Sequence, residues 1–411
     1  MKVKICIIGA GPAGLTAAIF SAGAGADTIV IEANSSPGQK LLLTGGRRCN
    51  LTHQAEPREL VRKFDGKGRF LSYCLHEFSP QDVREFFAGL GVPTKAEIDG
   101  CVFPVTNRAG DVRDALFERA KKLGVKFLFG KRVGNITKED GMFVVPVGKE
   151  RIYAEKLIIA TGGLSWPKTG CTGDGYRFAR QFGHRIVETR AALVPLVTLE
   201  TWPGQLAGTA LECVRITTRI NNKKITAEGA MVFTDDGLGG PAAQDMSRYL
   251  TDYLPVADTP IEIVLDMVRH IEQAELENRI IECIEANPKR KVVNILAGFV
   301  PKRLSALLCE QAGCDGRLPA GGLKKDMRKK LITTVKALPL SIVRTGSIAE
   351  ATVTRGGVDV TEIDPGTMES LVCPGLFFAG EVIDVDGPCG GYNIQMCWST
   401  GALAGFSAAE K

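Results

Sequence analysis

The pattern that most restricts how this chain can fold lies in its first 32 residues. Residues 3–8 (VKICII) form a short apolar run, GAGPAG follows at residues 9–14, and the next stretch carries apolar residues at helical spacing. A second apolar run, TIVIE at residues 28–32, ends in an acid. This order of strand, glycine-rich turn, helix and strand is typical of the βαβ unit in a nucleotide-binding parallel sheet. The chain is therefore predicted to be an α/β protein with a Rossmann-like domain at its N-terminus.

Each glycine of the turn has a physical role in such a unit. Gly9 allows the tight turn, Gly11 lets the backbone approach a pyrophosphate, and Gly14 lets helix and strand pack closely. The free N–H groups at the helix N-terminus would hold the diphosphate. Glu32 would accept hydrogen bonds from ribose hydroxyls, and its charge would repel a 2′-phosphate. The fingerprint therefore favours FAD or NAD over NADP.

The composition limits the class of protein. With 411 residues, 45% of them apolar and 24% charged, the chain is long enough for two or three globular domains. Its net charge of +5 suits an enzyme with anionic ligands, whereas a dedicated nucleic-acid binder is usually more basic. The basic clusters at residues 289–291 (KRK) and 324–330 (KKDMRKK) are interpreted as solvated helix faces. We therefore expect a small-molecule substrate and no nucleic-acid partner.

Cysteine usage and hydropathy bear on where the protein works. The 12 cysteines include no CxxC pair, which excludes zinc-ribbon and thioredoxin-type motifs, and unpaired cysteines fit a reducing cytoplasm. The N-terminal lysines and apolar residues resemble a secretory signal, but glycines interrupt that run. No other run reaches the roughly 18 apolar residues of a membrane span. We expect a cytoplasmic protein with no membrane partner, and the oligomeric state stays open.

Three further glycine-rich loops are predicted to contact the same ligand. Residues 41–52 (LLLTGGRRCNLT) begin nine residues after Glu32, and their arginines could pair with a phosphate. The strands at 157–160 (LIIA) and 376–379 (LFFA) each lead into a glycine-containing turn. A helix opening at about Gly391 would aim its positive end at the redox ring of a dinucleotide. Ligands bind at the carboxyl ends of parallel strands, so these loops should meet there.

Together these segments resemble the two-dinucleotide-binding-domain class of FAD proteins, and within it the YhiN-like (BaiN-like) flavoproteins, which include aminoacetone oxidases. The most specific segments are TGGRRCNLT, ATGGLSWPKTGCTGDGY, ATVTRGGVDVTEIDPGTMES and GLFFAGEVIDVDGPCGGYNIQMCWSTG. The resemblance implies FAD as cofactor, bound by residues from all four loops: Gly9, Gly11, Pro12, Ala13, Gly14, Glu32, Ala33, Lys40, Thr44, Gly45, Gly46, Arg48, Cys49, Asn50, Val133, Ala160, Thr161, Gly162, Gly380, Glu381, Gly390, Gly391, Tyr392, Asn393 and Ile394.

The same resemblance implies a discontinuous domain organisation. A Rossmann-like FAD domain would span residues 1–191 and 346–411 and be interrupted by a β-rich, barrel-like insertion at 192–266 and 336–345. A small helical subdomain would span 267–335. The sequence agrees, because 192–265 holds short β-rich runs and 267–335 reads as helical.

The chain departs from the family pattern at two places. The opening loop has Arg47 where relatives usually have a third glycine. In the insertion, FTDDGLGGP places Asp235 where relatives usually have histidine and Gly239 where they have serine. Asp235 could therefore change substrate choice or proton transfer.

The residues contain no catalytic triad and no metal cluster. Flavin carries hydride itself, so the protein needs only to position the substrate and tune the ring. The histidines (His53, His76, His184 and His270) lack metal-ligand spacing and are interpreted as structural or exposed. Cys49 and Cys171 are interpreted as small buried residues. The predicted catalytic residues are Tyr392, Arg48 and Asn50, and Arg47, Trp166 and Asp235 are further candidates to line the substrate site.

Three functions compete. The first is an FAD-dependent reductase of an activated C=C bond, such as an enone in a steroid-like or bile-acid-like substrate, with NAD(P)H as a transient electron donor because no second GxGxxG is present. The second is an FAD oxidase of a small amine that makes hydrogen peroxide. The third is an RNA- or partner-binding flavoprotein. We favour the reductase.

Overall fold

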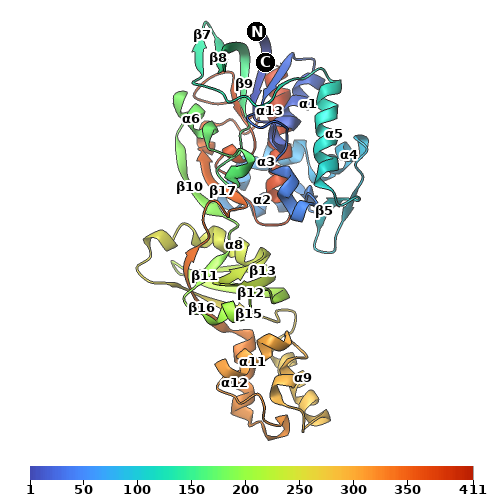
Figure 1. The fold of residues 1–411 in the computed structure, drawn as a ribbon, viewed down its shortest axis with the longest axis vertical. Coiled ribbons are helices and arrows are strands. Elements are labelled where there is room, and N and C mark those ends of the chain that lie inside the picture. Colours follow the sequence, from blue (N-terminus) through green and yellow to red (C-terminus); the bar gives the residue numbers. More distant parts are fainter. Residues whose placement is uncertain (411) are drawn as a thin grey trace. The chain divides into compact units, whose positions relative to one another are not determined.

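The computed structural model describes residues 1–410 and divides into two compact units (Figure 1). Met1–Arg190 and the chain from Ile348 onward form the first unit, and Ala191–Ser347 form the second. The first unit is a mixed sheet with helices on its faces, and the second joins a barrel to helices. The predicted fold class, a Rossmann-like domain interrupted by a barrel-like insertion and a helical part, is confirmed.

The sheet of the first unit begins with the strands predicted from the fingerprint. β1 (Lys2–Ile8) pairs in parallel with β2 (Thr28–Ile31) on one side and with β9 (Glu150–Ile159) on the other. β6 (Lys126–Leu128) extends the sheet beyond β2, and β18 (Leu376–Phe378) pairs in parallel with the end of β9. β1, β2 and β18 are almost wholly buried, as expected of parallel strands covered on both faces.

The remaining elements of this unit surround that sheet. An antiparallel extension runs through β8 (Met142–Val147) and β7 (Thr137–Glu139), and β3 (Thr52–His53), β5 (Cys101–Pro104) and β4 (Thr94–Ala96) form a separate small sheet. β10 (Ile186–Ala192) pairs with β17 (Val353–Val358). The helices are α1 (Pro12–Gly23), α2 (Pro57–Lys63), α3 (Gly68–Glu77), α4 (Pro80–Gly89), α5 (Ala109–Lys122), α6 (Asp174–Gln181) and α13 (Tyr392–Glu410).

Two helices from opposite ends of the chain, α1 and α13, lie against each other (Figure 1). A Cβ atom added at Gly401 would lie 2.5 Å from the Ala13 carbonyl oxygen, and one at Gly405 would lie 2.3 Å from that of Ala17. Residues four apart occupy one face of a helix, so these glycines form a flat strip that admits the backbone of α1. The close approach fixes the N-terminal ends of both helices in the same domain.

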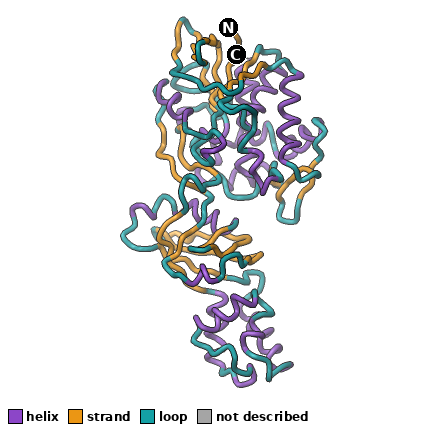
Figure 2. Tube along the Cα trace, in the orientation of Figure 1, coloured by secondary structure: helices purple, strands orange, loops and turns teal. Residues whose placement is uncertain are grey.

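The second unit is built around a closed barrel in the order β11-β14-β13-β12-β15-β16 (Figure 2). The strands are β11 (Leu196–Thr198), β12 (Ala210–Ile220), β13 (Lys223–Thr234), β14 (Gly237–Gly239), β15 (Ile261–Asp266) and β16 (Leu338–Thr345). Helices α7 (Trp202–Gln205) and α8 (Pro241–Leu250) contact the barrel. Between β15 and β16 the chain forms α9 (Gln273–Ala286), α10 (Val292–Leu296), α11 (Lys302–Gln311) and α12 (Lys325–Lys336).

Each unit has its own apolar core. The first core is formed by the parallel strands, α1, α13 and helices α3 to α5, and the second by barrel side chains that merge with those of α9 to α12. Within residues 1–410, no helix is long and apolar enough to cross a membrane.

The glycine strip of α13 yields a stability prediction. Gly405→Ala should lower the free energy of unfolding by about 1–3 kcal/mol, because the added methyl group meets backbone that cannot move cheaply. Gly23→Ala is the matched control, since no atom lies within 4 Å of its Cβ position, and it should be neutral or stabilising by up to about 1 kcal/mol. Urea unfolding of both variants tests this, and parental stability of Gly405→Ala would contradict it.

Candidate dinucleotide site

A pocket opens at the carboxyl ends of the first two strands. Gly9, Glu32 and Ala33 line it from the ends of β1 and β2, and Val133 and Thr161 line it from neighbouring loops. This is the edge at which open parallel sheets bind nucleotides. The pocket therefore lies at the sheet edge that the sequence pattern indicated, and the binding of a dinucleotide there stays a prediction.

In the glycine-rich turn, Gly9 and Gly14 pack closely against backbone, whereas Gly11 faces open space. Gly9 has a φ of +102°, and a Cβ there would lie 2.5 Å from the Ala160 carbonyl oxygen. At Gly14 a Cβ would lie 1.9 Å from the carbonyl oxygen of Gly9, so glycine is required for α1 to meet β1. Gly11, in contrast, has no atom within 4 Å of its Cβ position. The open backbone at Gly11, next to the α1 N-terminus, fits a pyrophosphate.

Glu32 is held by three hydrogen bonds at the edge of the pocket. The Ala10 backbone N–H donates to Oε2 at 2.7 Å, and the backbone and side-chain amides of Asn34 both donate to Oε1 at 2.8 Å. The Asn34 side chain also donates to the Thr169 carbonyl at 2.9 Å. These bonds fix the carboxylate beside Gly9, as the binding of a ribose would require.

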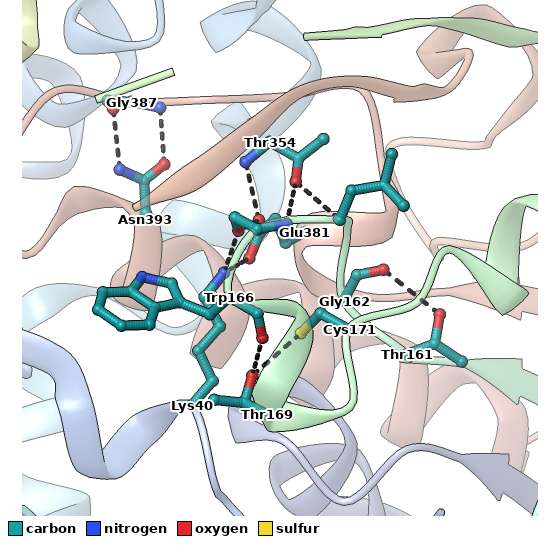
Figure 3. Close-up of polar contacts among 12 residues, drawn as sticks. Lys40, Thr161, Gly162, Trp166, Thr169, Cys171, Thr354, Glu381, Gly387 and Asn393 are labelled. Carbon is teal, nitrogen blue, oxygen red and sulfur yellow. Dashed lines mark hydrogen bonds and ion pairs between the residues drawn. The ribbon is translucent and has the colours of Figure 1, made fainter. Parts of the chain in front are cut away.

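A partly buried polar network joins three of the predicted loops (Figure 3). Lys40 forms an ion pair with Glu381 and donates to the Ser165 hydroxyl at 2.6 Å. The Glu381 carboxylate also accepts from the Ser165 hydroxyl at 2.7 Å and from the Thr354 backbone N–H at 2.8 Å. The Thr354 hydroxyl in turn accepts from the backbone N–H groups of Leu164 and Ser165, at 2.8 and 3.0 Å. Segments separated by more than 300 residues are thereby locked together.

The charge of Lys40 is stable in this network. Burial works to lower the pKa of Lys40, but the adjacent Glu381 carboxylate more than offsets that effect, so the pKa lies above its ordinary value. The Lys40 ammonium is therefore held in its charged form, and the adjacent Glu381 carboxylate balances its charge. Trp166, labelled in Figure 3, follows Ser165 in the chain, is 38% exposed and has a left-handed backbone with a φ of +54°. A bulky residue in that conformation is uncommon and is found more often at functional sites.

The 44–50 loop is a tightly wound segment whose geometry depends on its glycines. Gly45 and Gly46 have φ values of +54° and +66°, and Arg47 and Cys49 also have positive φ. The Arg48 guanidinium lies 3.8 Å from the centre of the Phe103 ring and 2.6 Å from a Glu97 carboxylate oxygen. Arg48 is thus engaged by the small β3-β5-β4 sheet, while Arg47 is exposed.

At Asn50 the 44–50 loop reaches Gly391, the residue before the start of α13. The Asn50 side-chain oxygen accepts from the Val102 backbone N–H at 3.2 Å, and it would lie 2.8 Å from a Cβ at Gly391. Tyr392 is 5% exposed, and its ring stacks on His53 with centroids 4.9 Å apart and planes at 19°.

His53 is the member of this group that the sequence interpretation set aside. Its Nε2 lies 3.1 Å from the Asp99 carbonyl oxygen, and its buried Nδ1 has no partner among the described residues. Burial, the largest effect, lowers the pKa of His53, so the ring is neutral at pH 7. Its proximity to Tyr392 gives no signal in the sequence, because the two residues are far apart along the chain. Ser165 and Thr354 were missed for the same reason.

The cysteines near the site are protonated thiols. Burial raises the pKa of Cys49 and of Cys397 to about 12, and it also raises the pKa of Cys171. A thiol with so high a pKa is a poor nucleophile, which favours the interpretation of Cys49 and Cys171 as buried packing residues. No cluster of His, Cys, Asp and Glu suited to a metal ion occurs in the described part of the chain.

The structure brings most predicted site residues into one region of the first unit. Pro12, Ala13 and Gly14 begin α1, Gly380 and Glu381 follow β18, and Asn393 and Ile394 lie in the first turn of α13. Asn393 holds the preceding loop by exchanging two hydrogen bonds with the Gly387 backbone, each 2.8 Å (Figure 3). Asp235 belongs to the second unit. The roles of all these residues toward FAD stay predictions, but the geometry fits such a group.

Comparisons with known proteins agree with this site. The model of the HI0933-like protein Rossmann domain family matches residues 3–407. A 3-dehydro-bile acid delta(4,6)-reductase of Clostridium scindens is 31% identical over 99% of both chains. A ribosomal RNA dihydrouridine synthase of Escherichia coli is 32% identical and covers 96% of this chain and 95% of its own. Among solved structures, a 3-ketosteroid delta1-dehydrogenase of Sterolibacterium denitrificans covers all of both chains with a TM-score of 0.56 at 12% identity, a likeness of fold alone.

A pocket lined by fingerprint residues at the sheet edge and near full-length similarity to named oxidoreductases lead to one assignment. The chain belongs to the HI0933-like Rossmann family of FAD-dependent oxidoreductases.

Proposed function

We propose that this protein is a reductase of a C=C bond conjugated to a carbonyl group, with FAD as its redox cofactor and NAD(P)H as the electron donor. The observation that carries the proposal is the 31% identity, over 99% of both chains, to a named bile-acid delta(4,6)-reductase. The sequence has no second dinucleotide fingerprint, so the nicotinamide would bind transiently and leave.

The residues at the start of α13 suit this chemistry. When bound, the flavin supplies a hydride to the carbon of the C=C bond farther from the carbonyl. Negative charge then develops on the carbonyl oxygen, and a proton must reach the other carbon. Tyr392 carries a hydroxyl at the beginning of a 19-residue helix, where backbone N–H groups favour negative charge. Tyr392 would therefore donate the hydrogen bond or proton, and the stacked His53 would hold its ring.

The Lys40–Glu381 network would act on the cofactor rather than on the substrate. It lies in the loops predicted to surround the ribityl and diphosphate portion, and its cation is held by two groups, the Glu381 carboxylate and the Ser165 hydroxyl. A preorganised positive charge stabilises an anionic ligand without reorganisation. Lys40 would therefore increase FAD affinity.

Uridine in RNA is a second candidate substrate, against the expectation drawn from the sequence. The observation that favours it is the 32% identity to a relative named as a ribosomal RNA dihydrouridine synthase. Dihydrouridine forms when the ring C=C bond of uridine, which is conjugated to a carbonyl, gains a hydride and a proton. The two candidates therefore require the same reaction and differ in what carries the reactive ring.

The electron donor is tested first by anaerobic stopped-flow mixing of the yellow holoprotein with NADH and NADPH. We expect one of them to bleach the flavin band near ~450 nm, and the reduced protein to be reoxidised by a steroid-like dienone or by uridine-containing RNA. Bleaching by small amines, with rapid reoxidation by air, would instead indicate the amine oxidase. A protein that takes up no FAD would overturn the whole proposal.

Tyr392→Phe should separate the two halves of the reaction. Flavin reduction by the nicotinamide should keep its parental rate, because no proton is taken from Tyr392 in that step. Reoxidation by the enone should slow by about 10²–10⁴-fold, the usual contribution of a positioned acid. The control is Tyr73→Phe, which removes an exposed hydroxyl from α3. Equal slowing of both half-reactions, or of neither, would remove Tyr392 from the proton-donor role.

His53→Phe tests the positioning role of the stacked ring. It keeps an aromatic partner for Tyr392 but removes the bond to Asp99, so reoxidation by the enone should slow less than in Tyr392→Phe. The pH profile of that step should stay unchanged, because a positioning residue supplies no proton. A shifted profile would make His53 itself the acid.

Substitutions in the ion pair should affect both stability and FAD affinity. Lys40→Met leaves the Glu381 carboxylate buried without its partner, so the apoprotein should lose about 3–5 kcal/mol of unfolding free energy. The double variant Lys40→Met/Glu381→Gln should recover part of that loss. Both variants should bind FAD at least tenfold more weakly by flavin fluorescence titration. Lys168→Met, an exposed lysine nearby in the chain, is the control; parental FAD affinity in Lys40→Met would contradict the assignment.

A further inference from the structure

We propose that one end of the helical part of the second unit binds the phosphate backbone of RNA. The surface, here named the basic tip, consists of Lys289, Arg290, Lys291, Lys324, Lys325 and Lys329. This inference rests on the RNA candidate of the proposed function and adds where the RNA is held.

The charge of the protein is concentrated in this region. Residues 287–336 contain twelve Lys and Arg against three Asp and Glu, a net charge of +9, whereas the whole chain carries +5. The remainder is therefore net negative, by 4 charges. A region whose net positive charge is larger than that of the whole protein has the electrostatic pattern expected of a surface that binds a polyanion.

The fold brings the two basic clusters together although 32 residues separate Lys291 from Lys324. Lys291 pairs with Pro319 in an antiparallel bridge, and the Ala320 N–H donates to the Arg290 carbonyl at 2.8 Å. The Leu323 N–H donates back to the Ala320 carbonyl at 3.0 Å, and Lys324 follows as the N-cap of α12. The 289–291 segment thus lies beside the turn that leads into α12 and its lysines.

The side chains of the basic tip are available to a partner. All six are exposed, and none forms an ion pair with another residue in positions 1–410. By contrast, Arg328, on the same helix, lies 3.8 Å from a Glu277 oxygen and packs inward. Lys325 and Lys329 are four residues apart and share one helix face.

Two lysines of the basic tip lie at a helix N-terminus, where positive charge lowers the stability of the helix. Lys324 is the N-cap and Lys325 the first residue of α12, next to the positive end of the helix dipole, where acids are favoured. Asp326 is the acid of this first turn, and the two lysines before it place positive charge where the helix dipole disfavours it, a departure from local preference that is expected at functional positions. The helix dipole adds to the positive potential that an anion would meet.

RNA fits this surface better than a membrane does. A membrane-bound helix needs an apolar face toward the lipid, but Leu331, Ile332 and Val335 of α12 are buried in the unit's own core. What remains exposed is cationic and polar. Sequence-independent contact of Lys and Arg with phosphates is the usual source of nucleic-acid affinity.

The test is RNA binding by the full-length holoprotein as a function of salt. The probe is a fluorescein-labelled RNA hairpin of mixed sequence, followed by anisotropy over a KCl series. The tip variant is Lys289→Glu/Lys291→Glu/Lys325→Glu. The matched control, Lys2→Glu/Lys122→Glu/Lys149→Glu, makes the same charge change at exposed lysines of the first unit. The tip variant should bind at least tenfold more weakly than the control, and the slope of log affinity against log salt should fall by about 2–3.

An arginine variant and a vesicle-binding measurement distinguish the possible causes of a change in RNA affinity. Replacing the same three lysines by arginine should keep parental binding, which excludes a loss of structure as the cause. Parental affinity in the tip variant, equal losses in tip and control variants, or no RNA binding by the parent at low salt would overturn the proposal. Tighter binding of phosphatidylserine vesicles than of RNA, lost in the tip variant, would also overturn it in favour of a membrane.

Turnover of a small dienone or of free uridine separates this inference from the proposed function. The tip variant should reduce small substrates at the parental rate, because the tip would hold only the RNA backbone. A parent that reduces no such C=C bond would sink the proposed function, whereas parental turnover with salt-insensitive RNA binding would sink the basic tip alone.

Discussion

The packing of α13 against α1 is the contact on which the site depends. Gly401 and Gly405 let the backbone of α13 approach Ala13 and Ala17 to distances that no side chain would allow. Both helices begin beside the carboxyl edge of the parallel sheet, so this packing brings two positive helix ends into one domain. Because α1 starts at residue 12 and α13 at residue 392, the contact also closes the first unit around its long insertion.

The buried Lys40–Glu381 pair makes that closure specific. Apolar packing would tolerate small shifts of the loops against one another, whereas the carboxylate must meet Lys40, Ser165 and the Thr354 backbone at the same time. A partly satisfied network of this kind would cost more than an apolar one. The three loops are therefore held in one arrangement, and the same cation serves the proposed binding of an anionic cofactor.

Reduction of a conjugated C=C bond unites two relatives whose named substrates differ greatly in size. A bile-acid reductase acts on a small molecule and an RNA dihydrouridine synthase on a macromolecule. In our proposals the chemistry belongs to the first unit, and the basic tip of the second unit provides for a large anionic substrate. Asp235, which the resemblance predicts to stand where the family usually has histidine, lies in that second unit and stays a predicted candidate for substrate choice.

The features of this protein that could be predicted from its sequence are those that depend on residues close together in the chain. The GAGPAG turn, the two strands of the βαβ unit and the acid at residue 32 could be predicted, because glycine geometry and apolar runs act within about thirty residues. The Rossmann-like class and the FAD-dependent family were accordingly predictable, the latter with the help of resemblance.

Contacts between residues far apart in the chain became visible only in the fold. Three contacts join distant segments in a way that periodicity cannot specify: the stacking of His53 on Tyr392, the hydrogen bond from Thr354 to Glu381, and the bridge of Lys291 with Pro319, shortly before Lys324. The basic clusters appeared as separate solvated helix faces in the sequence, because charge along a chain does not reveal its neighbours in space. Folding determines whether such charges disperse or combine, and here an antiparallel bridge combines them.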